Sequence, residues 1–204
     1  MFKSKNITLA VGMTVVALTS QAWANPVTYL GTGLTTDVTI THNGSNMYVR
    51  AGEIFIDYSA IKLTAYCVDL DHWVKNAWDA TPASVSTING GLEAAWLYDH
   101  FAKSVTTGAE GAALQIAIWE VVDDFGGTPN LSTGNFSFSG AKSVLTSAQS
   151  YLNAMPSDLS GYTTPSFIVK SGDVVRSQNL IVPEPAALAL LASGLPILLA
   201  GRRR

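Results

Sequence analysis

Between residues 27 and 69 the chain carries short runs in which hydrophobic residues alternate with polar ones or cluster as β-branched and aromatic side chains. This pattern is typical of strands, and it predicts them over 27–30, 37–41, 47–50, 54–58 and 62–69. Asn43-Gly44 separates the second run from the third, and this dipeptide favours a tight hairpin turn. This part of the chain is therefore predicted to form antiparallel strands.

The period of the hydrophobic pattern changes after Asn89. Apolar residues then recur at helical spacing, which predicts helices over 92–101, 108–122 and 139–155. Asp123-Asp124 oppose a helix dipole and predict that the second helix stops there. Late strands are predicted over 166–170 and 174–176. Strands, then helices, then strands predict a single α+β domain, with an antiparallel sheet or sandwich-like portion and an inserted portion of about three helices.

The N-terminus has the three-part pattern of a secretory signal peptide. Two lysines precede an apolar run from Ile7 to Leu18, and Ala22-Trp23-Ala24 fits the small-residue motif that signal peptidase cleaves. We therefore predict that residues 1–24 are removed on export, with Ala22 and Ala24 as the cleavage signal. A permanent N-terminal anchor is the alternative, although the run is shorter than the roughly 20 residues that span a bilayer.

Residues 182–204 show a second targeting pattern. A polar motif and an apolar stretch at 186–200 precede a basic tail; the motif and tail residues are Val182, Pro183, Glu184, Pro185, Arg202, Arg203 and Arg204. The stretch predicts a short membrane helix whose basic end stays in the cytoplasm, which leaves the rest of the chain outside. This tripartite segment resembles the PEP-CTERM sorting signal of Gram-negative bacteria, which the membrane protease exosortase reads.

The PEP-CTERM resemblance implies that the tail is removed during sorting, so that the membrane is a transient partner. It also implies an exported protein at the cell surface or in the extracellular matrix of a Gram-negative bacterium. Proteins with this signal are generally associated with extracellular polysaccharide and with biofilm formation. A permanent C-terminal anchor is the alternative.

The segment between the two signals, 25–181, is predicted to be the functional ectodomain. Residues 25–182 contain 7 Lys and Arg against 14 Asp and Glu, which excludes a nucleic-acid binder because phosphate binding needs clustered basic residues. A single cysteine excludes a disulfide framework and a Cys-based zinc site. The acids Asp69, Asp71 and Asp79 do not follow calcium-loop spacing, and the 3 histidines are scattered. No metal or cofactor is predicted.

Two residues are candidates for chemistry. Cys67, the lone thiol, lies at the end of a predicted apolar strand, where the simpler interpretation is a small buried hydrophobe. Gln115 lies inside the most apolar predicted helix, and its helical neighbours place it on an inward-facing side. An unpaired buried amide costs roughly 1–3 kcal/mol, so Gln115 is expected to have a specific partner.

Tyr66-Cys67-Val68 on a strand, followed by Leu114-Gln115-Ile116-Ala117-Ile118-Trp119 on a helix, resembles the paired signature of the bacterial thioester domains of surface adhesins. The intervening Ala94–Tyr98 segment is similar as well, and the likeness spans roughly residues 50–155. The resemblance implies that the Cys67 sulfur and the Gln115 side-chain carbonyl are joined as an internal thioester, formed with loss of ammonia.

A thiol suits this chemistry because sulfur is first a good nucleophile and later a good leaving group. We hypothesise a single covalent attachment to an amine or hydroxyl of a protein or polysaccharide surface, rather than enzymatic turnover. A water-excluding pocket is expected around the bond, lined by Tyr66, Trp73, Trp96 and Trp119.

His72 is the candidate proton carrier, and Asp69 is the candidate residue to orient a thiol or a backbone amide. His42 and His100 are expected in a turn and on a helix surface. Two alternatives stay open. One is a non-covalent structural protein of the polysaccharide matrix, in which Cys67 is a free thiol. The other is a cysteine hydrolase that pairs Cys67 with His72 or His100.

Overall fold

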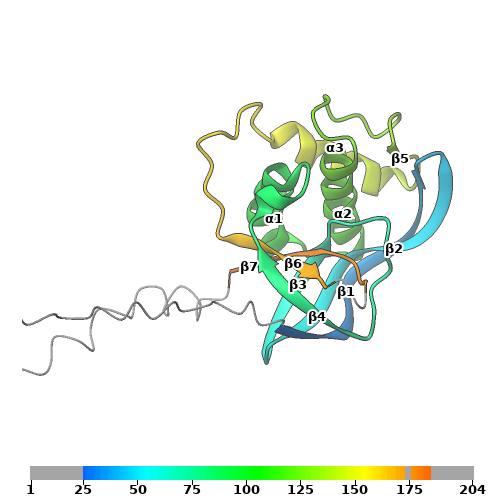
Figure 1. Ribbon diagram of the computed structural model, residues 1–204. Coiled ribbons are helices and arrows are strands. Elements are labelled where there is room, and N and C mark those ends of the chain that lie inside the picture. The colour runs from blue at the N-terminus through cyan, green and yellow to red at the C-terminus, as the bar shows by residue number, and fades with distance from the viewer. Residues whose placement is uncertain (1–24, 173–175, 185–204) are drawn as a thin grey trace, which may run out of the picture.

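The structure is a computed structural model that describes residues 25–172 and 176–184. Seven antiparallel strands form one sheet, and three α-helices pack on one side of it (Figure 1). The strands are β1 (Asn25–His42), β2 (Ser45–Tyr58), β3 (Ile61–Cys67), β4 (Ala77–Ala83), β5 (Phe136–Phe138), β6 (Ser166–Ser171) and β7 (Leu180–Pro183). The helices are α1 (Gly91–Phe101), α2 (Gly108–Asp123) and α3 (Lys142–Ala154), with short 3-10 turns η1 (Val85–Thr87) and η2 (Ala102–Ser104). The predicted α+β single domain is confirmed.

The sheet closes on itself through its long first strand. The strand order is β2-β3-β7-β6-β4-β1-β5, and β1 also pairs with β2. The start of β1 pairs with β4, whereas its end pairs with β5. Because β7 lies between β3 and β6, the last strand of the chain is an interior strand of the sheet.

β1 and β2 form the predicted hairpin, with His42 opposite Ser45. The turn residues Asn43 and Gly44 both have positive φ angles, 49° and 75°, as a tight two-residue turn requires. Register shifts interrupt the pairing between Tyr29 and Gly31 and between Thr32 and Thr35. These irregularities bend β1. The β1–β2 hairpin therefore takes part in the closed sheet and also forms the surface on which α2 packs.

α2 is the central helix of the molecule, because it packs on β1, β2, α1 and α3. Every residue from Gly111 to Val121 is buried, which explains why the helix is apolar on all sides. A capping box between Thr107 and Glu110 fixes its start, and it ends at Asp123, where the acidic pair predicted a stop.

Three features of the sheet differ from the sequence prediction. β4, β5 and β7 were not expected: β4 contains Asp79 and Pro82, and β5 has three residues, so neither carries a strand pattern of its own. The predicted strand at 174–176 is wrong at Arg176, which lies in no strand, and its first two residues lie outside the described ones. His42 is buried rather than exposed in a turn, with 8% of its surface accessible.

The predicted sorting motif begins inside the sheet. Val182 is fully buried in β7 and Pro183 ends that strand, so the predicted boundary at 181/182 falls within an element. Ala22, Ala24, Pro185, the apolar stretch 186–200 and Arg202–Arg204 lie outside the described residues. None of the described helices combines the length and apolarity that crossing a bilayer requires.

Candidate functional site

Cys67 is the last residue of β3 and is 1% exposed. On one side of β3 it lies opposite Leu180 of β7. On the other side β2 stops pairing with β3 at Ile54, opposite Ala65, two residues before the cysteine. The main chain of Cys67 therefore lacks a strand partner on the β2 side, although it is buried.

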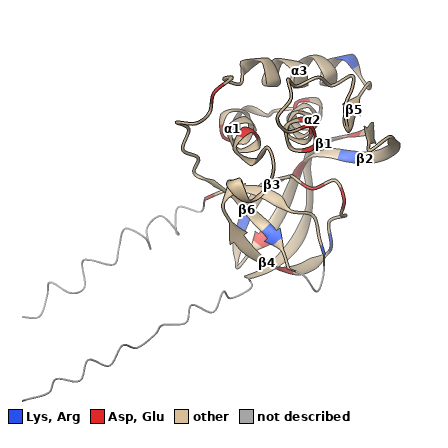
Figure 2. Ribbon diagram, turned by 45° about the horizontal axis from the view of Figure 1, so that its top comes forward, with Lys and Arg blue, Asp and Glu red and all other residues tan. Residues whose placement is uncertain are grey.

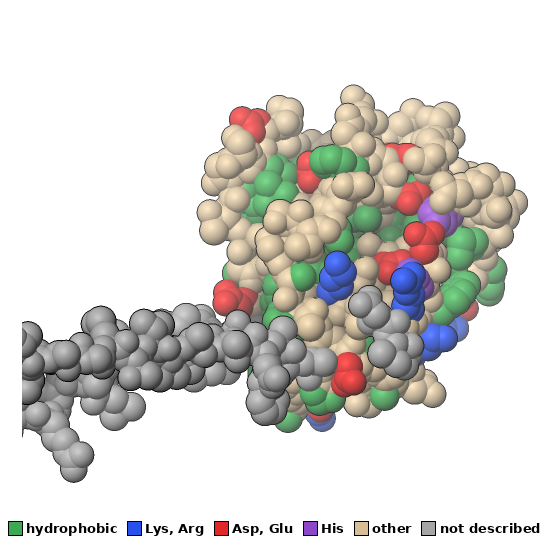
Figure 3. All heavy atoms as spheres, in the orientation of Figure 1, with side chains coloured by type: hydrophobic (Ala, Val, Ile, Leu, Met, Phe, Trp, Pro, Cys, Tyr) green, Lys and Arg blue, Asp and Glu red, His purple; other side chains and the backbone are tan. Residues whose placement is uncertain are grey.

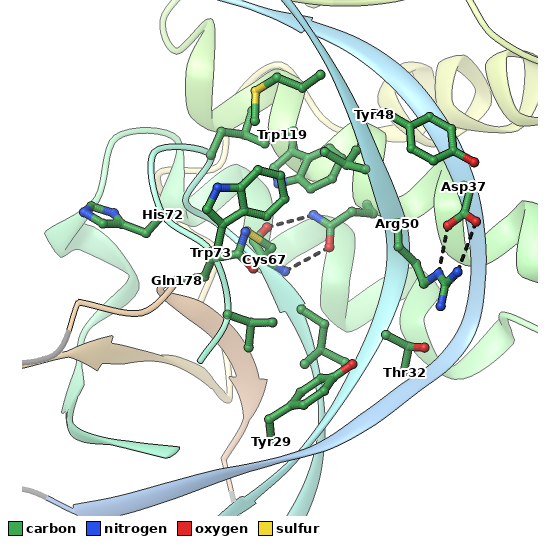
Figure 4. Close-up of a pocket in the computed structure, with 16 residues that line it drawn as sticks. Tyr29, Thr32, Asp37, Tyr48, Arg50, Cys67, His72, Trp73, Trp119 and Gln178 are labelled. Atoms are coloured by element: carbon green, nitrogen blue, oxygen red, sulfur yellow. Dashed lines mark hydrogen bonds and ion pairs between the residues drawn. The ribbon is translucent and has the colours of Figure 1, made fainter. Parts of the chain in front are cut away.

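The Gln115 side chain takes the place of the missing strand. The Cys67 N–H donates to Gln115 Oε1 at 2.9 Å, and Gln115 Nε2 donates to the Cys67 carbonyl at 2.8 Å (Figure 4). Gln115 is itself 1% exposed. The predicted inward orientation is confirmed, and the carboxamide of α2 is held against the cysteine by two hydrogen bonds that mimic a β-ladder.

The N-terminal part of α2 fixes the position of Gln115 relative to the strands of the sheet. Gly108 and Gly111 lie so close to β1 that a Cβ on them would come within 2.4 Å of the Thr35 carbonyl oxygen and 2.0 Å of the Leu34 carbonyl oxygen, respectively. Gln115 stands one turn after Gly111 on the same side of the helix. The two glycines thus let the helix approach β1, and this approach carries the carboxamide to Cys67.

The thiol of Cys67 is held by the loop that follows β3. Cys67 Sγ donates to the Asp69 carbonyl oxygen at 2.9 Å and accepts from the Asp69 N–H at 3.3 Å. Burial raises the pKa of the thiol to about 12, although the Trp119 indole and the Asp69 backbone act in the opposite direction. The sulfur is therefore a neutral thiol at physiological pH, and its reactivity must come from position rather than from ionisation.

Asp69 and His72 form a pair beside the cysteine. His72 Nδ1 lies 3.0 Å and 2.9 Å from the two carboxylate oxygens of Asp69, which also accept the N–H groups of Asp71 and Asn179. The His72 ring points away from Cys67 and Gln115 (Figure 4). The main chain of Asp69 thus holds the thiol, its carboxylate holds the loop, and the imidazole of His72 does not reach the sulfur.

A cavity of about 350 Å³ lies over the Cys67–Gln115 pair. Of the four aromatic residues expected around the bond, Trp119 lines it from α2 and Trp73 from the loop after β3. Tyr66 and Trp96 are not part of it. Strand alternation turns Tyr66 to the opposite face from Cys67, where it packs on Tyr98, and Trp96 stacks on His100 at 4.0 Å.

The opposite wall of the cavity comes from residues that the sequence did not single out. The hairpin β1–β2 and the segment before β7 contribute Tyr29, Thr32, Asp37, Met47, Tyr48, Val49, Arg50, Ile54 and Gln178. Asp37 and Arg50 face each other across the hairpin as a two-pronged ion pair, at 2.8 Å and 3.0 Å. They could not be found from sequence spacing because the bend of β1 brings them to the cavity.

No group of three His, Cys, Asp or Glu side chains within the described ranges is placed to hold a metal ion. Basic residues are scattered over the ribbon rather than gathered in one patch (Figure 2). No family model, no curated protein and no solved structure matches this chain.

Proposed function

We propose that this protein is an exported surface or matrix protein that stores an internal thioester between Cys67 and Gln115. It uses this bond once, to attach itself covalently to an amine or hydroxyl on a protein or polysaccharide surface. One observation carries the proposal: the two reciprocal hydrogen bonds that hold a buried carboxamide against the only cysteine, under a cavity. The residue pattern that resembles thioester domains of adhesins supports it.

The geometry supports formation of the bond. The Cys67 N–H on Gln115 Oε1 polarises the carbonyl and stabilises the negative charge that this oxygen gains when sulfur attacks the adjacent carbon. The C–N bond then breaks, the C–S bond forms, and the thiol proton leaves with the nitrogen as ammonia. The thiol gives up its proton as sulfur attacks, so the leaving nitrogen receives its proton without a separate acid.

The surroundings support storage of the bond. Cys67 and Gln115 are each 1% exposed, and Trp119 and Trp73 cover them, so bulk water has little access to the acyl carbon. The cavity gives a small nucleophile a route to the same carbon. Its attack forms an amide or ester at Gln115, and the released sulfur takes up the proton that the nucleophile loses.

Export supports the same function. A signal peptide at 1–24 and a PEP-CTERM-like tail place signal peptidase and exosortase among the processing partners and the domain outside the inner membrane. A domain that acts once, on a fixed surface, needs no catalytic turnover.

Intact mass tests the proposal. The purified chain is weighed before and after methylamine treatment, beside Cys67→Ala. We expect a wild type that is lighter than calculated by one ammonia and that gains methylamine, whereas the variant does neither. A wild type at its calculated mass with a titratable thiol contradicts a stored bond.

One observation favours a second candidate, a non-covalent matrix protein. The same two hydrogen bonds satisfy the main chain of Cys67 without any reaction, so a structural role for Gln115 has a physical basis. The mass experiment separates the two functions. The hydrolase alternative lacks a base at the sulfur, because the His72 ring points away and His100 packs on Trp96.

A further inference from the structure

The cavity over Cys67 and Gln115 opens between two exposed aromatic rings. Trp73 is 60% exposed and Tyr48 is 72% exposed, and they stand on different walls, the loop after β3 and the β1–β2 hairpin (Figure 4). Large aromatic side chains left in water on both sides of one opening indicate a ligand surface. The flat, apolar C–H face of a sugar ring packs well on such rings.

Polar groups line the same cavity as these rings. The Asp37–Arg50 pair, the Thr32 hydroxyl and the Gln178 carboxamide all line the same cavity. Planar side chains with fixed donors and acceptors suit the neighbouring hydroxyls of a sugar. An alkyl stem such as that of lysine offers no hydrogen bonds to the Thr32 hydroxyl and the Gln178 carboxamide, which opposes its binding.

The site also selects the nucleophile. His72 lines the cavity, but its ring points away from Cys67 and Gln115, and both oxygens of its partner Asp69 are hydrogen-bonded, so no base stands next to the Cys67–Gln115 pair. A hydroxyl needs a base to react, whereas a neutral amine does not. A sugar amine is less basic than that of lysine, because adjacent oxygen-bearing carbons withdraw electron density, so more of it is neutral near pH 7.

Charge favours the same acceptor. Residues 25–182 have twice as many acidic as basic side chains, and the one arginine that lines the cavity is neutralised by Asp37. A polysaccharide with free amines is partly cationic and is attracted to such a surface, whereas an acidic polysaccharide is repelled.

We propose that the acceptor is an amino sugar with a free amine in a polysaccharide, held between Trp73 and Tyr48. This inference rests on the proposed thioester. The sugar nitrogen bonds to the Gln115 acyl carbon, the C–S bond breaks, and the proton lost by the amine goes to the Cys67 sulfur. The products are an amide-linked sugar and a free thiol.

The test compares acceptors on the full chain by the rate of adduct formation in intact mass. The probes are a glucosamine oligosaccharide, its fully N-acetylated counterpart, a lysine-containing peptide at equal amine concentration, and methylamine. We expect the glucosamine oligosaccharide to react about tenfold faster than the peptide, which corresponds to the free energy of one or two contacts with an aromatic ring. The acetylated form, which has no free amine, should give no adduct. A peptide that reacts as fast or faster overturns the inference in favour of a protein acceptor.

Variants separate recognition from chemistry. Tyr48→Ala, which leaves the rings that cover the bond in place, should slow the glucosamine oligosaccharide about tenfold while methylamine, which needs no ring contact, changes by less than about twofold. Phe125→Ala removes an aromatic ring of similar exposure, 55%, outside the cavity, and should change neither rate. Equal loss for both nucleophiles in Tyr48→Ala would mean that the ring supports the bond rather than holding a sugar.

If the protein does not react with methylamine, the proposed thioester itself is contradicted. If it reacts with methylamine but only slowly with the sugar, the amino-sugar acceptor alone is contradicted. Recognition can then be measured without the bond in Cys67→Ala, which keeps the main-chain hydrogen bonds to Gln115. The acetylated oligosaccharide should bind this variant, and adding Trp73→Ala should weaken that binding about tenfold. Unchanged binding in the double variant overturns the sugar site.

Discussion

The side chain of Gln115 forms hydrogen bonds with the main chain of Cys67, not with its thiol. Substitutions of the two residues therefore have unequal effects on stability. Cys67→Ala keeps both hydrogen bonds, whereas Gln115→Leu leaves a buried N–H and a buried carbonyl unpaired. In a Cys67→Ala background, where no thioester can form, adding Gln115→Leu should lower the free energy of unfolding by about 2–4 kcal/mol. Urea unfolding followed by tryptophan fluorescence measures this difference.

Gln149→Leu on α3, in the same background, is the matched control, because that side chain bonds only to the exposed Asn153. It should change the free energy of unfolding by less than about 0.5 kcal/mol. If Gln115→Leu lowers the free energy of unfolding as little as Gln149→Leu does, the Cys67 main chain does not depend on the Gln115 carboxamide.

Glu120 predicts a pH dependence of stability. Its side chain is 1% exposed, its Oε1 accepts the Asn130 N–H, and its Oε2 is buried without a hydrogen-bond partner. Burial, together with the charges of Asp124 and Asp123, raises the pKa of Glu120 to about 7 despite the Asn130 hydrogen bond. Acidic and histidine side chains gather on the hairpin side of the face seen in Figure 3.

Because the folded pKa of Glu120 is higher than the usual value of about 4.3, the folded state binds the proton more tightly than the unfolded state. Its contribution to stability is therefore complete below pH 4 and is lost as pH rises to 7, by up to about 3 kcal/mol. The melting temperature should fall over this range, and Glu120→Gln should remove much of the slope. Glu93→Gln on α1 is the control; a slope identical in wild type and Glu120→Gln would assign the effect to other groups.

At the scale of elements, the approach of α2 to β1 controls the site. Gly111→Ala would put a Cβ 2.0 Å from the Leu34 carbonyl oxygen, so helix and strand must separate. We expect a loss of about 1–3 kcal/mol in the free energy of unfolding, although alanine is the better helix former. Gln115 lies one turn further on, so methylamine incorporation should fall as well, as intact mass will show.

Gly127→Ala is the matched control, since the nearest atom to its added Cβ is 3.5 Å away. It should leave both stability and methylamine incorporation unchanged. A Gly111→Ala protein with normal incorporation would show that Gln115 reaches Cys67 independently of the contact between α2 and β1.

The elements that could be predicted from the local sequence are those whose hydrophobic residues recur with a clear helical or strand period. α1, α2, α3 and the β1–β2 hairpin were predicted from apolar spacing and from Asn43-Gly44. β4 is a strand because neighbouring strands pair with it, which no local pattern reveals, whereas β7 carries an apolar, β-branched run that was not recognised because its end was assigned to the sorting motif. The same limit applies to the site: chemistry identified Cys67 and Gln115, whereas Tyr48 and Arg50 reach the cavity only through the bend of β1.

One part of the site was accessible to sequence reasoning and was missed. Residues adjacent in a strand point to opposite faces, so the sequence favours placing Tyr66 on the face opposite Cys67. The placement of Trp96 depends on how α1 packs, and its stacking on His100 could not be read from spacing.

At the scale of the whole molecule, the last described strand, β7, holds Cys67 within the sheet. β7 lies between β3 and β6, pairs Leu180 with Cys67, and buries Leu180, Ile181 and Val182 completely. Its end lies within the segment that resembles a sorting signal. If the tail is removed, as the resemblance implies, the cut must fall after Pro183 for the domain to keep this interior strand.

Two shortened chains test this requirement. A chain that ends at Glu184 keeps β7, whereas one that ends at Asn179 loses the strand and leaves the facing edges of β3 and β6 unpaired. Loss of three fully buried aliphatic side chains removes about 5 kcal/mol or more of hydrophobic stabilisation, which is comparable with the whole stability of a domain. We expect the shorter chain to be unfolded by circular dichroism and inert to methylamine, and the longer one to match the full chain in both assays. If the shorter chain folds and reacts normally, β7 does not hold Cys67 in place, and the partner strand of the thiol must be sought elsewhere in the sheet.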